Sequence, residues 1–121
     1  MQTILFIFIG GGLGSLARFG ISKLITSVFV SINPFATLIS NILATAILGT
    51  IVFFYSFKGE VSYIIKPLII IGFCGGFSTF STFSFETFEL LKTGNIFFAV
   101  LNVTISIIIG VSILFLLSKT I

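Results

Sequence analysis

Four long apolar segments constrain the fold of this 121-residue chain more than any other feature of its sequence. They cover roughly residues 3–25, 35–57, 67–92 and 96–118. Each is near the roughly 20 residues that a helix needs to cross a bilayer. The chain is 57% hydrophobic and only 7% charged, which is typical of integral membrane proteins. The sequence therefore predicts an all-α integral membrane protein, a single domain over residues 1–121 with four transmembrane helices.

The few polar and charged residues exclude several classes of function. The six basic residues are scattered, so nucleic acid is not expected as a partner. Cys74 is the only cysteine, which excludes an internal disulfide. The chain has no histidine, and histidine is the usual proton shuttle at neutral pH and the commonest metal ligand.

The third apolar segment contains a stretch that opposes a continuous helix, GFCGGFSTFSTFSFE from Gly72 to Glu86. Gly75 and Gly76 each weaken a helix by about 1 kcal/mol relative to alanine. Five serine and threonine hydroxyls follow, and they can satisfy backbone groups that a break exposes. We therefore predict that the third helix is broken near midspan, at Gly75–Ser78. A flexible kink that serves packing alone is the alternative interpretation.

A break at this place would free backbone carbonyls, which are natural ligands for a small monovalent cation such as sodium. The basic residues also fall equally on the two sides of a four-span chain, three against three, so the positive-inside rule gives no orientation. One side carries Lys58, Lys66 and Lys119, and the other carries Arg18, Lys23 and Lys92. We therefore hypothesise that the chain inserts in both directions and forms an antiparallel homodimer with the two breaks at its centre.

Three side chains in apolar surroundings are candidates for binding an anion. A buried Asn41 amide must find a hydrogen-bond partner, either an anion, a facing carbonyl or a neighbouring helix. Phe80 and Phe83 share one face of a helix, and a phenyl edge carries positive charge that can meet an anion. Packing against lipid or protein is the alternative role for both rings.

Further donors form a possible polar track. Ser106 and Asn102 lie four residues apart on the fourth segment, and Ser81 and Thr82 could join them. No acidic residue lies at the middle of a span, which favours an anion as the permeant species. Glu86 is expected near an interface. Arg18 is either a snorkelling side chain or a structural one that holds loop carbonyls.

The sequence closely resembles the Fluc family of bacterial fluoride channels, the CrcB-like proteins, over essentially its whole length. The resemblance rests on GGGLGSLARF in the first segment, NPFATLISN in the second and GFCGGFSTFSTFSFE in the third. Three positions depart from the family pattern. Ala36 replaces a usual glycine, Ser40 a usual apolar residue, and Asn102 a frequent tyrosine.

This resemblance implies a dual-topology homodimer with two antiparallel, fluoride-selective pores in a bacterial inner (plasma) membrane, surrounded by lipid. It implies a structural sodium ion bound by the carbonyls of Gly75 and Ser78 from both copies. Asn41 would donate to fluoride, Phe80 and Phe83 would line the pores, and Arg18 would be structural. The other implied pathway residues are Thr37, Ser81, Thr82, Ser106 and Glu86. The role would be passive fluoride export, without any catalysed reaction.

Two other functions remain as alternatives. A small proton-coupled multidrug exporter also has four helices, but it should carry a glutamate in its first helix, where this chain has none before Arg18. A scaffold or assembly subunit without transport would make Asn41, Phe80 and Phe83 packing residues only.

Overall fold

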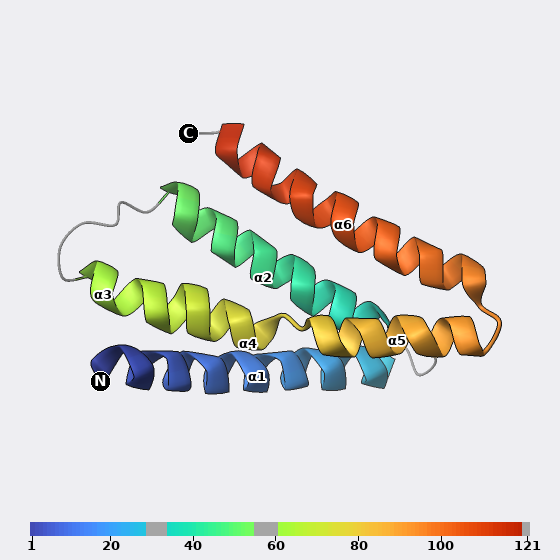
Figure 1. The fold of residues 1–121 in the computed structure, drawn as a ribbon, viewed down its shortest axis with the longest axis horizontal. Helices are drawn as coiled ribbons and strands as arrows, with labels where there is room; N and C mark the ends of the chain where they lie inside the picture. The colour runs from blue at the N-terminus through green and yellow to red at the C-terminus, as the bar shows by residue number, and fades with distance from the viewer. Residues whose placement is uncertain (29–33, 55–60, 120–121) are drawn as a thin grey trace.

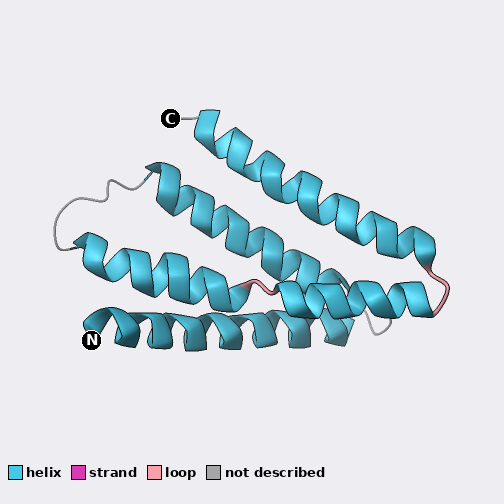
Figure 2. Ribbon diagram, viewed as in Figure 1, coloured by secondary structure: helices cyan, strands magenta, loops and turns pink. Residues whose placement is uncertain are grey.

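The fold is a bundle of long helices, seen in a computed structural model that describes residues 1–28, 34–54 and 61–119. Over these residues every regular element is helical (Figures 1 and 2). The elements are α1 (Gln2–Val28), α2 (Pro34–Phe54), α3 (Val61–Ile65), the π-helix η1 (Lys66–Cys74), α4 (Gly75–Phe77), α5 (Phe80–Lys92) and α6 (Ile96–Lys119).

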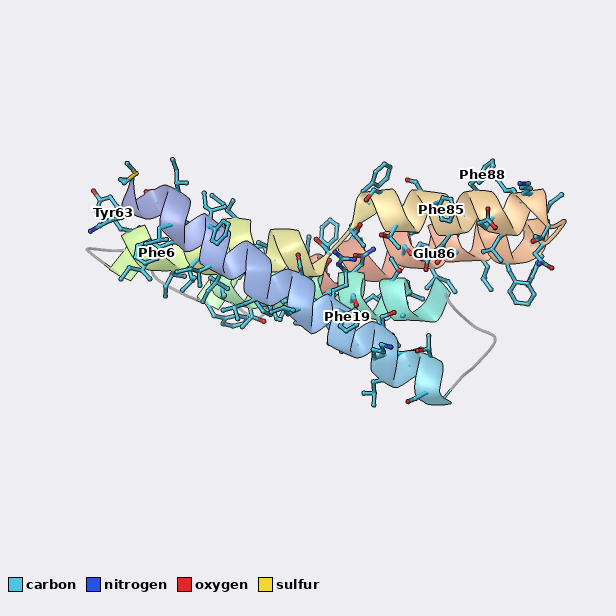
Figure 3. The ribbon with its side chains drawn as sticks, turned by 90° about the horizontal axis from the view of Figure 1, so that it is seen from below. Phe6, Phe19, Tyr63, Phe85, Glu86 and Phe88 are labelled. Carbon is cyan, nitrogen blue, oxygen red and sulfur yellow. The ribbon has the colours of Figure 1, made fainter. Side chains whose placement is uncertain are left out.

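Within the described residues, four helical spans are long and apolar enough to cross a membrane, which agrees with the predicted number. They are Gln2–Ser27, Ala36–Phe54, Ser62–Lys92 and Ile96–Lys119. The start of α1 and the end of α6 lie at the same end of the bundle (Figure 1), as an even number of crossings requires. Many apolar side chains point outward, including Phe19 and Tyr63 (Figure 3), and such a surface suits lipid or another protein.

The third span begins earlier than the sequence indicated. Its helix starts at Val61, so the expectation that Pro67 opens this helix is wrong. Pro67 lies instead at the start of η1, inside a continuous helical run. Because proline has no N–H, it cannot close an α-helical hydrogen bond at this position. The hydrogen-bond pattern is that of a π-helix from Lys66 to Cys74.

The third span is broken near its middle, as predicted, but the break at Ser78 and Thr79 overlaps the predicted range Gly75–Ser78 only at Ser78. Gly75 has helical angles, φ −66° and ψ −36°. Ser78 and Thr79 are extended, with ψ of 156° and 124°. The Thr79 hydroxyl accepts a hydrogen bond from the Thr82 amide at 3.2 Å and so caps the start of α5. The cap, rather than the glycine pair, decides where the helix restarts.

Glycines let α1 approach the third span closely. A Cβ atom added at Gly76 would overlap the carbonyl oxygen of Gly11, and one at Gly10 would overlap that of Leu68. The same holds for Gly14, whose added Cβ would overlap the carbonyl of Phe73. Small residues one turn apart commonly serve this purpose in membranes. Gly10 and Gly14 thus let α1 pack closely against the third span.

A tight turn joins α5 to α6. Gly94 has a φ of +86°, which a residue with a side chain rarely adopts. The Asn95 amide donates to the Leu90 carbonyl at 2.8 Å, and the Gly94 amide donates to the Leu91 carbonyl at 3.2 Å. These bonds satisfy carbonyls at the end of α5. The turn brings α6 back alongside α5 and α2 (Figure 1).

Candidate functional site

Asn41 on α2 binds the backbone at the break of the third span. Its Oδ1 accepts from the Thr79 amide at 2.9 Å, and its Nδ2 donates to the Thr79 carbonyl at 3.4 Å. The side chain thus replaces the backbone partners that Thr79 lost when the helix broke. An amide nitrogen carries two N–H groups, and this pair uses only one of them.

Arg18 on α1 holds the other side of the break. Its Nε donates to the Gly76 carbonyl at 3.2 Å. This contact is what a structural role of Arg18 requires, whereas snorkelling to the membrane interface would not need it. A guanidinium bonded to the main chain of a neighbouring helix also fixes α1 against α4 at the level of the break.

Two carbonyls at the break lack their usual helical partners. The Thr79 amide, which would bond the Gly75 carbonyl in a continuous helix, donates to Asn41 instead. The Ser78 amide donates to the Cys74 carbonyl at 3.0 Å. The Thr82 amide, which would bond the Ser78 carbonyl, donates to the Thr79 hydroxyl. The carbonyls of Gly75 and Ser78 therefore lack the backbone amides that would bond them in a continuous α-helix.

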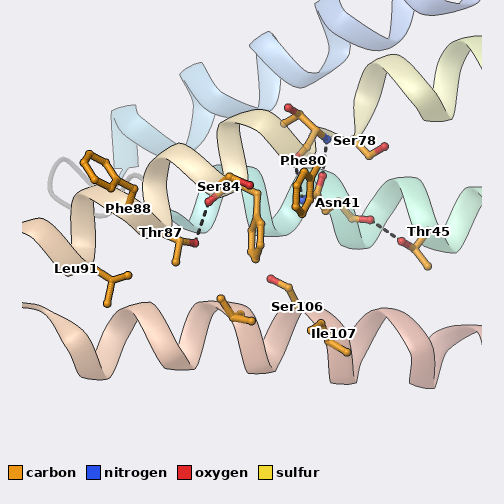
Figure 4. A pocket seen from close by; sticks show the side chains of 13 residues that line it. Asn41, Thr45, Ser78, Phe80, Ser84, Thr87, Phe88, Leu91, Ser106 and Ile107 are labelled. Carbon is orange, nitrogen blue, oxygen red and sulfur yellow. Dashed lines mark hydrogen bonds between the residues drawn. The ribbon is translucent and has the colours of Figure 1, made fainter.

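A groove runs from the break along α5 and α6, with a volume of about 730 Å³ (Figure 4). We call it the Asn41 groove. Its walls come from α2, the break, α5 and α6. Its lining residues are Asn41, Thr45, Ser78, Thr79, Phe80, Phe83, Ser84, Thr87, Phe88, Leu91, Val103, Ser106 and Ile107.

The lining of the Asn41 groove is mostly apolar, includes several amide and hydroxyl side chains, and has no charged residue among the described residues. The Ser106 hydroxyl oxygen is buried and has no hydrogen-bond partner among the described residues. Together with the second N–H of Asn41 it offers donors to a guest. Phe80 is 80% exposed, Phe83 is partly buried, and their ring centroids are 6.2 Å apart. An uncharged groove with free donors and aromatic walls can accept a small anion.

The structure brings four of the predicted pathway residues into this groove, namely Asn41, Phe80, Phe83 and Ser106. Four others lie outside its lining: Thr37, Ser81, Thr82 and Glu86. Ser81 is exposed, and its hydroxyl lies 3.2 Å from that of Thr79. The pathway role of these four residues stays a prediction.

Thr37 and Glu86 form a second polar contact between α2 and α5. Thr37 is only 6% exposed, and its side chain lies near the Glu86 carboxyl group. One carboxyl oxygen, Oε1, is buried without a partner among the described residues. Glu86 lies on the side of α5 that faces α2 (Figure 3). This pair is separate from the Asn41 groove.

Two threonines that the sequence did not single out belong to the site. Thr79 is the partner of Asn41 and the cap of α5. Thr87 lines the groove and accepts a hydrogen bond from Asn102 at 3.3 Å. For Thr87 the available signal was its spacing of four residues from Phe83, since such residues share a helix face. Thr79 could not be singled out, because the five hydroxyls of this stretch were equally good candidates for the cap.

Comparison with known proteins places this arrangement in a family. The family described as CrcB-like protein, Camphor Resistance (CrcB), matches residues 5–117. The chain belongs to the CrcB-like family. A relative from Pyrococcus abyssi, named fluoride-specific ion channel FluC, is 42% identical over 116 residues, which is 96% of this chain and 93% of the relative.

Two further CrcB-like relatives carry the same name. The one from Pyrococcus horikoshii is 43% identical over 95% of this chain and 92% of its own length. The one from Azobacteroides pseudotrichonymphae is 40% identical over 91% of this chain and 88% of its own length. These names describe ion channels, so the family is one of channels and not of enzymes. Family and helices together identify a multi-pass membrane protein.

Proposed function

We propose that this chain forms a passive channel selective for fluoride. The carrying observation is the Asn41 groove, where a free amide N–H, a free Ser106 hydroxyl and two phenyl rings meet without any charged residue. Membership of the CrcB-like family, whose relatives are named as fluoride-specific ion channels, supports the identity of the ion.

In this proposal the groove replaces the water around the ion. A small anion is strongly hydrated, so it enters a narrow path only where donors compensate for the lost water. The second N–H of Asn41 and the hydroxyl of Ser106 donate to fluoride, and the edges of Phe80 and Phe83 face it. With no cationic lining residue, the ion is not bound too strongly to leave.

We also propose that two oppositely inserted copies form the functional unit. The groove is open on one side in a single chain, and a second copy would close it. The balanced basic residues permit both orientations. Each dimer would then contain two antiparallel pores.

A sodium ion between the two copies fits the chemistry of the break. The carbonyls of Gly75 and Ser78 have lost the amides that would bond them, and oxygen dipoles suit a hard monovalent cation. Gly75 is exposed, and a Cβ there would meet nothing within 4 Å in a single chain. The sodium would supply positive charge that neutralises these carbonyl dipoles and joins the copies.

The cellular role that follows is passive export of fluoride across a bacterial plasma membrane. Fluoride enters as its neutral weak acid and ionises in the cytoplasm. An open, selective path lets the trapped anion leave down its electrochemical gradient. Energy from ATP or from a proton gradient is not needed for this step.

Efflux from liposomes loaded with fluoride, followed with a fluoride electrode, tests the function. Rapid efflux without a proton gradient, with chloride retained, is the expected result. Efflux only with a proton gradient would instead support a small exporter. No efflux would support a scaffold subunit. The exporter is the weaker alternative, because α1 has no acidic residue.

Orientation is tested separately by placing a protease site at either terminus in sealed vesicles. Half protection of each tag is expected if both orientations are used. Complete protection or complete cleavage of every copy would exclude the antiparallel arrangement.

A further inference from the structure

We propose that Asn102 is a positioning residue that acts through Thr87 on the Asn41 groove, rather than a donor to the permeant ion. Asn102 lies on α6 and is only 7% exposed, yet it is absent from the groove lining. This inference rests on the proposed channel function for its effect on transport, but its structural part can be tested without fluoride.

The helix α5 is weakly packed. None of the residues of α5 from Phe80 to Lys92 is buried in the single chain. Apolar burial therefore does little to fix this helix against its neighbours. Its place must depend largely on a few polar contacts, which are effective where water is scarce.

Three such contacts hold α5. Asn41 binds Thr79 at its start, and Thr37 contacts Glu86 on the side towards α2. Among the described residues, the only side-chain hydrogen bond between α5 and α6 is that of Asn102 with Thr87. Losing it would leave the α6 side of α5 without a polar anchor.

The contact continues into the wall of the groove. Asn102 Nδ2 donates to Thr87 Oγ1 at 3.3 Å, and Thr87 Oγ1 donates to the Phe83 carbonyl at 2.9 Å (Figure 4 shows the second bond). Ala99, one turn before Asn102, is 1% exposed, so the helices are close at this level. The chain of bonds ties α6, which carries Ser106, to the backbone of Phe83.

Asn102 thereby sets the spacing between two walls of the groove, Phe83 on α5 and Ser106 on α6. One of its amide N–H groups donates to Thr87, and its side chain does not line the groove. A change in this spacing would alter how well the groove replaces water around the ion. It would not remove a ligand from the ion.

The test compares Asn102→Leu and Thr87→Val, singly and together, with Thr104→Val as the matched control on the exposed face of α6. In fluoride-loaded liposomes at low protein density, the fraction of vesicles that empty counts active channels, and the rate reports turnover. Each single change should slow turnover about 2- to 10-fold, the range expected for one neutral hydrogen bond, with the active fraction preserved. The double change should be no slower than the slower single one.

Several results would overturn the proposal. Normal turnover in Thr87→Val beside slow turnover in Asn102→Leu would mean that Asn102 donates to the ion directly. Additive losses of turnover in the double variant would also mean that Asn102 donates to the ion directly. A reduced active fraction with unchanged turnover would mean a general folding role.

Amide hydrogen exchange of the detergent-solubilised protein gives a readout that does not depend on fluoride. Exchange along α5 should quicken to a similar extent in Asn102→Leu and Thr87→Val, and not in Thr104→Val. If the unaltered protein fails to pass fluoride, the proposed channel function is wrong. The exchange pattern still shows whether Asn102 acts on α5 through Thr87. Unchanged exchange in both variants would overturn it.

Discussion

Asn41 holds the broken backbone and still has one N–H to offer the groove. The sequence predicted that this amide must bond something, because an unpaired amide in apolar surroundings costs about 2–7 kcal/mol. It did not predict Thr79 as the partner, since the two residues are 38 positions apart and meet only through the packing of α2 against the break. The sequence likewise identified Phe80, Phe83 and Ser106, and the structure places all three in one groove.

Replacing Asn41 by leucine should reduce fluoride efflux by at least about 10- to 100-fold, as expected for loss of a hydrogen bond to an anion. The backbone at the break should also lose the hydrogen bonds between Asn41 and Thr79. Efflux from liposomes measures the first effect, and size-exclusion chromatography should show that the dimer is retained. Asn95→Leu, which alters an exposed turn amide, is the control. Normal efflux in Asn41→Leu would mean that the amide serves helix packing only.

Removing the Ser106 hydroxyl should slow fluoride efflux without weakening the fold. The oxygen is buried without a partner, so Ser106→Ala loses no hydrogen bond within the described residues. A loss of about 2- to 10-fold is expected if the hydroxyl donates to the ion. Ser118→Ala, at an exposed hydroxyl that donates to the Phe115 carbonyl, is the matched control. Equal rates for the two variants would exclude Ser106 from the pathway.

At the scale of elements, the third span is a short α-helix, a π-helix, a second short α-helix, a break and a capped α-helix in succession. Composition and the glycine pair predicted that a break exists near midspan. The predicted range Gly75–Ser78 began too early, because Gly75 and Gly76 belong to a helix that lies close to α1, and only Ser78 of that range lies in the break. The π-helix had no recognisable signal apart from Pro67, whose effect depends on where the helix begins.

Replacing Gly76 by alanine should destabilise the fold, because the added methyl group would overlap the Gly11 carbonyl. Overpacking of this kind typically costs about 1–3 kcal/mol. Thermal unfolding in detergent should therefore show a lower midpoint for this variant. Gly20→Ala is the control, since a Cβ there would meet nothing within 4 Å. Equal midpoints would show that α1 and α4 can move apart freely.

At the scale of the whole molecule, the sequence predicted four spans with both ends on one side, and the structure agrees. The antiparallel dimer stays a prediction, because a single chain shows only the surfaces that a second copy would cover. The open groove and the exposed Gly75 are two such surfaces. Neither can be recognised from hydrophobicity alone, since helix surfaces that face lipid and those that face another helix are both apolar in membranes.

Sodium should be required for a stable, conducting dimer. Replacing it on both sides by a large organic cation such as N-methylglucamine should lower fluoride efflux, and returning sodium should restore it. The physical reason is that the carbonyls of Gly75 and Ser78 would face their counterparts without a neutralising charge. If efflux does not recover when sodium is returned, the organic cation has damaged the protein irreversibly. Equal efflux with and without sodium would remove the ion from the account.

The measurement that tests the channel most directly is the reversal potential in a planar bilayer with opposed gradients, more fluoride on one side and more chloride on the other. The account predicts a passive current that reverses close to the fluoride equilibrium potential. A current that reverses close to the chloride potential, or the absence of current from protein that is folded and dimeric, would contradict it.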